Sequence, residues 1–161
     1  MSSLVIISFL AIALLPLVVA TTLLMSMTPR YRTAPQAVAF IYGFLLREWA
    51  GLILFIWVLV RYPRSRQMEK NRAIQFWWAQ SLLNLCKRLY HLNIKVTGTE
   101  ALKGNSALVL SRHSSIGDTV LPLLFFGKAR GEGVRYVLKQ ELRLLPCLDI
   151  GGHRLPNVFV D

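Results

Sequence analysis

The sequence predicts an α/β domain preceded by a pair of membrane helices. Apolar residues make up 54% of the 161 residues, and they crowd into residues 1–60. Short strand-like and helix-like stretches alternate in the rest of the chain, which is typical of an α/β sheet. We therefore divide the chain into three parts: a membrane-anchoring helical pair at 1–62, a basic amphipathic helix at 63–92 and an α/β domain at 93–161.

The first apolar segment is free of charge from Met1 to Pro29. Its apolar core, residues 4–27, exceeds the ~20 residues that a hydrocarbon layer requires. The uncharged start lacks the basic region of a cleavable signal peptide. Pro16 predicts a kink, which a membrane helix tolerates. We expect this segment to span the membrane or to insert deeply into it.

The second apolar segment, residues 37–60, has the same length but carries Arg47 and Glu48 near its middle. Ionised groups at that depth are costly unless they are paired, hydrated or turned toward protein. Two arrangements remain open. Either the segment spans the membrane with this pair facing the first helix, or it lies partly in the interface.

The charge balance favours a lipid surface as the partner. The chain holds 19 Lys and Arg against 8 Asp and Glu, a formal charge of +11. Basic residues beside a membrane segment are attracted to anionic lipid, and no nucleic-acid-binding module is visible. Two arginines lie in the linker, and five basic residues follow the second segment: Arg61, Arg64, Arg66, Lys70 and Arg72. This asymmetry predicts a cytoplasmic (inner) membrane, with the C-terminal part facing the cytoplasm.

An amphipathic helix is predicted after this basic stretch. Apolar residues recur there at spacings of three and four: Ile74, Trp78, Leu82, Leu85, Leu89 and Leu92. The helix either covers the core of the following domain or rests its aromatic residues at the lipid boundary, and one helix can do both.

Beyond this helix, we predict four strands at 93–97, 106–111, 134–138 and 157–160, and two helices at 119–129 and 140–145, the second ended by Pro146. Cys86 and Cys147 have neither metal nor redox spacing, so we expect two reduced, partly buried thiols and no metal site.

His113 and Asp118 form the candidate catalytic pair, in the run Ser-Arg-His-Ser-Ser-Ile-Gly-Asp. If His113 lies in a strand-to-helix turn and Asp118 in the first helical turn, the carboxylate accepts from Nδ1–H and leaves Nε2 as a general base. Such a pair suits acyl transfer to a hydroxyl group. The alternative is that Asp118 caps the helix and His113 is a polar loop residue.

Three sequence blocks resemble the 1-acylglycerol-3-phosphate acyltransferase family. Residues 111–119 are similar to its His-x4-Asp block, and residues 136–146 to its Lys-x-Glu-Leu-x-x-x-Pro segment. Residues 157–161 resemble the strand that leads to its phosphate-contacting Arg. The family's Glu-Gly-Thr-Arg block is not found after these, so the chain is expected to be the N-terminal portion of an acyltransferase domain, truncated after these blocks.

The resemblance implies roles for four residues. His113 would be the general base and Asp118 its orienting partner. Lys139 would lie near the phosphate or acyl-donor site, although a solvated helix start explains it equally well. Arg112 would attract a phosphate, the alternative being a solvated arginine.

The function that follows is transfer of an acyl group from acyl-CoA or acyl-carrier protein to a lysophospholipid. The expected acceptor is lysophosphatidic acid, giving phosphatidic acid, without metal or bound cofactor. The 161-residue chain alone is expected to have poor activity. The alternative is a non-catalytic membrane-anchored fragment or pseudoenzyme that binds lipid or a partner.

Overall fold

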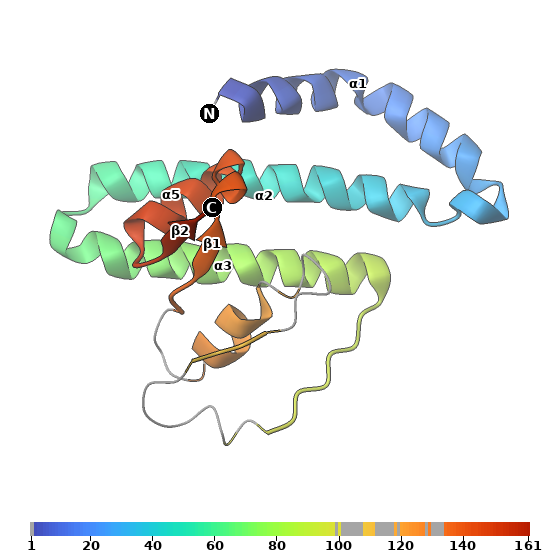
Figure 1. Ribbon diagram of the computed structural model, residues 1–161. Coiled ribbons are helices and arrows are strands. Elements are labelled where there is room, and N and C mark those ends of the chain that lie inside the picture. Colours follow the sequence, from blue (N-terminus) through green and yellow to red (C-terminus); the bar gives the residue numbers. More distant parts are fainter. Residues whose placement is uncertain are drawn as a thin grey trace.

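Three long helices dominate the computed structural model, which describes residues 2–98, 100, 108–111, 118, 120–127, 129 and 134–161. They are α1 (Ser2–Ser26), α2 (Ala34–Arg61) and α3 (Arg64–Tyr90), and the short helix η1 (Pro29–Tyr31) joins the first two (Figure 1). The described part of the chain is therefore mostly helical, and its two long apolar helices at the N-terminus were predicted from the sequence.

Helices α1 and α2 lie side by side in opposite directions. The Tyr42 hydroxyl donates to the Ala11 carbonyl at 2.6 Å, and the Trp49 indole nitrogen donates to the Ser8 hydroxyl at 2.8 Å. Helix α1 contains Pro16 and bends along its length (Figure 1). By length and composition, both helices are long and apolar enough to cross a membrane.

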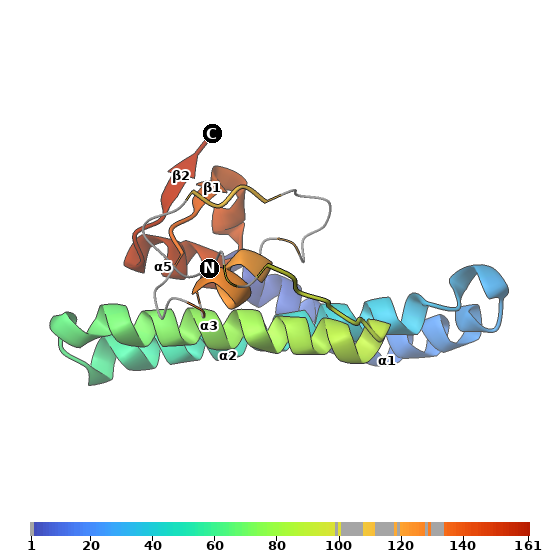
Figure 2. The same cartoon turned by 90° about the horizontal axis from the view of Figure 1, so that it is seen from below.

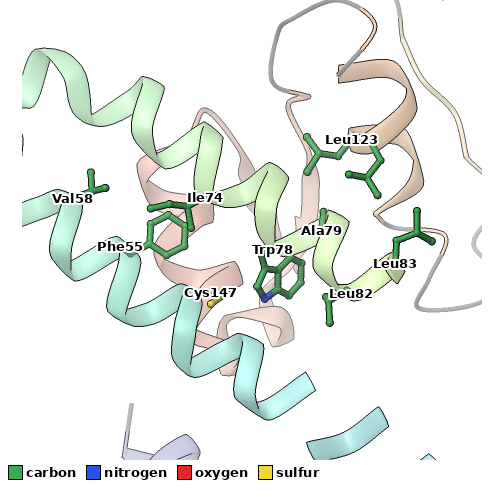
Figure 3. Close-up of a cluster of buried hydrophobic side chains, with 10 residues drawn as sticks. Phe55, Val58, Ile74, Trp78, Ala79, Leu82, Leu83, Leu123 and Cys147 are labelled. Carbon is green, nitrogen blue, oxygen red and sulfur yellow. The ribbon is translucent and has the colours of Figure 1, made fainter. Parts of the chain in front are cut away.

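The hydrophobic core lies between α2, α3 and the C-terminal part of the chain (Figure 3). On α3, the predicted apolar face is confirmed at Ile74, Trp78 and Leu82, which are all buried. The helix ends before Leu92, because His91 adopts the left-handed backbone conformation with φ 53°. The prediction that this helix covers the core of the following part is therefore confirmed.

Among its described residues, the C-terminal part contributes five short elements: η4 (Leu123–Gly127), β1 (Val137–Lys139), η5 (Gln140–Leu144), α5 (Pro146–Arg154) and β2 (Val158–Val160). Strands β1 and β2 pair in parallel, with Val137 opposite Val158 and Lys139 opposite Val160. Figure 2 shows α5, β1 and β2 on one side of the α2–α3 pair.

Several predicted elements are confirmed. The strand predicted at 134–138 overlaps β1 at residues 137–138, and the strand predicted at 157–160 contains β2. The helix at 140–145 corresponds to η5, and η4 lies within the helix predicted at 119–129. The sheet has two strands among the described residues, which is narrower than the predicted α/β sheet.

Two predicted strands are wrong in their described residues. Residues 91–98 and 108–111 have no regular structure, and 106–107 lie outside the described residues. Leu108 and Leu110 are 86% and 87% exposed, whereas a buried strand was expected. Alternating apolar residues form a strand only beside a partner that supplies hydrogen bonds, and neither segment pairs with a strand in the described part of the chain.

Helix α5 was not predicted, because Pro146 was interpreted only as the end of a helix. Pro146 instead occupies the start of α5, where its fixed φ and missing N–H are compatible with the helix. Asp149 lies in the first turn and Arg154 in the last, so these two charges complement the helix dipole.

Candidate functional site

The predicted catalytic residues are only partly covered by the structure. His113 and Arg112 lie outside the described residues, and with them the proposed contact between His113 and Asp118. Asp118 itself is half-buried and precedes η4. The catalytic pair therefore stays a prediction from the sequence.

Lys139 is the last residue of β1, at the carboxyl end of the parallel pair. Its Nζ lies 3.9 Å from Oε1 of Glu141, and both side chains are at least 70% exposed. An ion pair this long and this exposed holds the ammonium group only weakly. Lys139 is therefore accessible to an anionic ligand, at the sheet edge where open parallel sheets bind ligands.

The register of this edge is fixed at the other end of the two strands. The backbone N–H of Tyr136 donates to Oδ1 of Asn157 at 2.9 Å, and the N–H of Val158 donates to the Tyr136 carbonyl at 2.9 Å. Burial raises the pKa of the Tyr136 phenol to about 12, so that it stays protonated near neutral pH. These bonds set β1 against β2, and this brings Lys139 opposite Val160.

Glu48 forms the centre of a junction that sequence reasoning missed. Its side chain is fully buried. Its Oε1 accepts from the indole nitrogen of Trp78 at 3.0 Å, and its Oε2 accepts from the backbone N–H of Cys147 at 3.2 Å. Because Cys147 lies in the first turn of α5, one carboxyl group connects α2, α3 and the N-terminus of α5.

The two polar residues of α2 do not face the first helix. The Arg47 Nε donates to the Ser81 carbonyl at 3.1 Å, and its Nη1 donates to the Gly43 carbonyl at 2.7 Å. The arrangement in which the Arg47–Glu48 pair turns toward α1 is therefore wrong, because Arg47 bonds to α3 and Glu48 to α3 and α5. The sequence signal was the carboxylate itself, in the middle of an apolar run.

Neither cysteine shows signs of a reactive site. Both are free thiols, with Cys86 half-buried and Cys147 buried. Burial, and secondly the neighbouring Glu48 carboxyl group, raise the pKa of the Cys147 thiol. A thiol with a raised pKa is a poor nucleophile near neutral pH. Both thiols are partly or fully buried, as predicted, and their reduced state stays a prediction.

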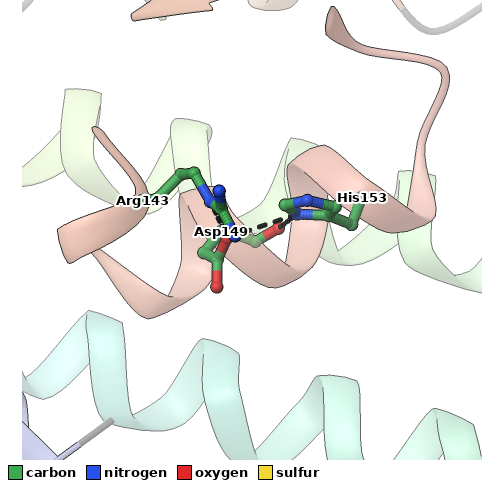
Figure 4. A network of polar contacts seen from close by, with 3 residues as sticks. All are labelled: Arg143, Asp149 and His153. Atoms are coloured by element: carbon green, nitrogen blue, oxygen red, sulfur yellow. Dashed lines mark hydrogen bonds and ion pairs between the residues drawn. The ribbon is translucent and has the colours of Figure 1, made fainter. Parts of the chain in front are cut away.

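A second polar cluster lies on the outer surface of α5 (Figure 4). Oδ1 of Asp149 lies 3.2 Å from Nε of Arg143 and 3.2 Å from Nδ1 of His153. The His153 ring also stacks on Phe159 of β2, with 5.1 Å between ring centroids. These three polar side chains are partly exposed, and their contacts attach η5 to α5 and α5 to β2.

Metal and ligand features are few in the part of the chain that the structure describes. Its residues contain no group of three or more His, Cys, Asp or Glu side chains able to hold a metal ion. A shallow hollow lies between α3 and the residues that precede strands β1 and β2. It is lined by Arg72, Gln75, Val134, Leu155 and Pro156. Nε of Arg72 and Oε1 of Gln75 are buried without a hydrogen-bond partner there.

Comparison with known proteins gives no relative. No known family matches the chain, and neither curated proteins nor solved structures show a significant similarity to it.

Proposed function

We propose that the protein transfers an acyl group from acyl-CoA or acyl-carrier protein to the free hydroxyl of a lysophospholipid, with lysophosphatidic acid as the acceptor and phosphatidic acid as the product. One observation carries the proposal. The second and third sequence blocks, 136–146 and 157–161, contain the two strands that pair in parallel, so their carboxyl ends meet at one edge with Lys139 exposed on it. That edge is where an α/β fold binds its ligand.

The chemistry proposed at this edge needs only a base and a thioester. Nε2 of His113 takes the proton of the acceptor hydroxyl while its oxygen attacks the thioester carbonyl, and Asp118 accepts a hydrogen bond from Nδ1–H. The tetrahedral intermediate then expels the thiolate, which recovers the proton from His113. Lys139, and Arg112 beside His113, would bind phosphate groups by charge-assisted hydrogen bonds.

The membrane is the source of the acceptor in this proposal. Helices α1 and α2 are long and apolar enough to anchor the chain. The basic residues that follow α2 would hold the C-terminal part at the cytoplasmic face of the inner membrane. A lysophospholipid in that leaflet would then reach the edge of the sheet without leaving the membrane surface.

The alternative proposal is a non-catalytic membrane-anchored protein that binds lipid or a partner. The position of the hydrophobic core favours this alternative. Among the described residues the core is formed mainly by helices, and it is centred on the α2–α3–α5 junction and not on the predicted site. The two proposals differ in whether His113 matters for product formation.

The test is transfer of a labelled acyl group to lysophosphatidic acid in membranes that carry the complete gene product. We expect the His113→Ala variant to lose about three orders of magnitude of activity, as is typical of a missing general base. The matched control is His91→Asn, because Asn tolerates the left-handed backbone at this exposed position. Immunoblots and thermal unfolding establish that both variants are present and folded.

The outcomes separate the proposals. Loss of product in His113→Ala, with full activity in His91→Asn, supports the acyltransferase. Unchanged activity in His113→Ala would show the mechanism to be wrong. If the unaltered protein forms no product with any lysophospholipid or donor, the non-catalytic alternative replaces it.

A further inference from the structure

Helix α2 contacts α1, α3 and α5, but one of its apolar faces is left uncovered. The covered face carries Glu48, Gly51 and Phe55, which contact α3 and α5. At about 100° per residue, the opposite face carries a stripe about 60° wide. The stripe is apolar and 51–81% exposed throughout, and it consists of Leu46, Ile53, Trp57 and Val60.

On the same uncovered side of the molecule, helix α3 presents basic residues instead of apolar ones. Its buried residues Ala79 and Leu83 belong to the core on the side of η4. Roughly opposite to them on the helical wheel lies a basic stripe with one aromatic residue, formed by Arg66, Lys70, Trp77 and Arg88. Both stripes therefore face away from α5, β1 and β2, which cover the other side of the helix pair (Figure 2).

We propose that this uncovered side is a docking surface for a bilayer with anionic headgroups, and that α2 lies flat in the interface instead of crossing it. The proposal rests on the membrane association proposed above but not on acyl transfer. An apolar stripe flanked by cations and a Trp complements a lipid surface, in which the apolar side chains enter the acyl region and the cations meet the headgroups.

The position of α5 argues against a crossing helix. Helix α5 attaches to α2 through Glu48 and Gly51, which lie near the middle of α2, and through Phe55 in its C-terminal half. If α2 crossed the bilayer, the polar side chains of α5 would lie at the depth of the hydrocarbon core. Asp149 and Arg154 belong to that helix, and charged groups at such a depth are strongly disfavoured. A flat α2 leaves α5 in water.

A flat α2 in the membrane interface also explains the exposed apolar surface of α1. Its contacts with α2 run antiparallel, from Tyr42 with Ala11 to Trp49 with Ser8, so α1 lies alongside α2. Leucine, isoleucine and valine side chains are exposed along its length. A helix without a polar face is suited to immersion in the leaflet.

The test measures the depth of single fluorescent labels with lipids that carry quenchers at known depths. Labels are attached to Leu46→Cys, Ile53→Cys and Val60→Cys in the full chain on a Cys86→Ser background. Vesicles contain phosphatidylcholine and phosphatidylglycerol. The parent without an added cysteine should stay unlabelled, because Cys147 is buried. A label at Val137→Cys, on the exposed face of β1, is the control that should not be quenched.

We expect the three labels on α2 to be quenched at one common, shallow depth. A crossing helix would instead separate the labels at Leu46 and Val60 by about 20 Å along the membrane normal, at ~1.5 Å per residue. That result overturns the flat arrangement, and so does the absence of quenching in vesicle-bound protein, which would assign the surface to a protein partner. Because the readout requires no product, its failure is distinct from failure of the acyl-transfer assay.

Discussion

The α2–α3–α5 junction and the carboxyl edge of β1–β2 are built on opposite principles. In the junction, a fully buried carboxyl group of Glu48 is bonded to Trp78 and Cys147, and apolar side chains fill the space around it. At the carboxyl edge of the strands, the Lys139 side chain is 74% exposed. One region is closed to solvent, and the other is open to it.

This difference indicates a division of labour. Burial and satisfied hydrogen bonds stabilise the junction, so changes there should lower the free energy of unfolding. The exposed edge contributes little packing, so changes there should alter ligand binding while leaving stability intact. The following variants test whether stability and chemistry separate in this way.

Glu48→Ala should have the largest effect on stability. It leaves the indole N–H of Trp78 and the backbone N–H of Cys147 without an acceptor in a buried site, and it creates a cavity. We expect a loss of about 3 kcal/mol in the free energy of unfolding. Denaturant unfolding of the detergent-solubilised protein measures it. Glu69→Ala, at an exposed position of α3, is the control that should unfold like the unaltered protein. Equal stability of the two variants would refute the role of the junction.

Gly51→Ala tests how tightly the same junction is packed. A Cβ at this position would lie 2.5 Å from Sγ of Cys147, so either α5 or α2 must shift. We expect destabilisation of about 2 kcal/mol, as in overpacked cores. Combination with Cys147→Ala removes the sulfur and should recover part of the loss, a non-additivity that the double-mutant cycle isolates. Strict additivity of the two losses would mean that α2 and α5 do not meet at Gly51.

Lys139→Met tests the open region. The side chain is 74% exposed and has one long ion-pair contact, so its removal should leave the unfolding transition unchanged. If it binds the acceptor's phosphate, KM for lysophosphatidic acid should rise roughly tenfold with kcat little changed. Lys95→Met, also exposed, is the matched control. An equal KM in both variants would remove Lys139 from the site.

The contrast also explains how much the sequence could predict. Apolar length and apolar periodicity are local signals, so α1 and α2 were found from the length of their apolar runs and the buried face of α3 from residue spacing. The strands β1 and β2 were found from short apolar runs bounded by turn residues. Helix α5 was missed, because Pro146 both ends and begins helices, and Gly151 and Gly152 disfavour a helix on propensity. Tertiary contacts stabilise this helix in spite of its propensity. The Glu48 carboxyl group accepts a hydrogen bond at the N-terminus of α5, and α5 packs so closely on α2 that a Cβ on Gly151 would lie 3.3 Å from the Phe55 ring.

For the candidate site, the sequence could predict which residues take part and their order along the chain, but not their contacts in space. The sequence predicted a strand at 134–138 with Lys139 directly after it, whereas in the structure Lys139 is the last residue of β1. It could not identify Glu48 as a junction, because the partners Trp78 and Cys147 are 30 and 99 residues away. Contacts of that separation depend on the whole fold, which local patterns do not encode.

The smallest effect is expected for Asp149→Asn, which tests whether the polar cluster on α5 belongs to the junction or to the open surface. The change weakens the contacts of Asp149 with Arg143 and His153 but keeps the shape of the side chain. These groups are more than a third exposed, so solvent screens them, and we expect a loss below ~1 kcal/mol. Salt titration of the unfolding midpoint supplies the control, since added salt should bring the variant and the unaltered protein together. A loss as large as that of Glu48→Ala would mean that the surface of α5 stabilises the fold as strongly as its buried N-terminus, and the proposed separation of stability from surface chemistry would fail at this helix.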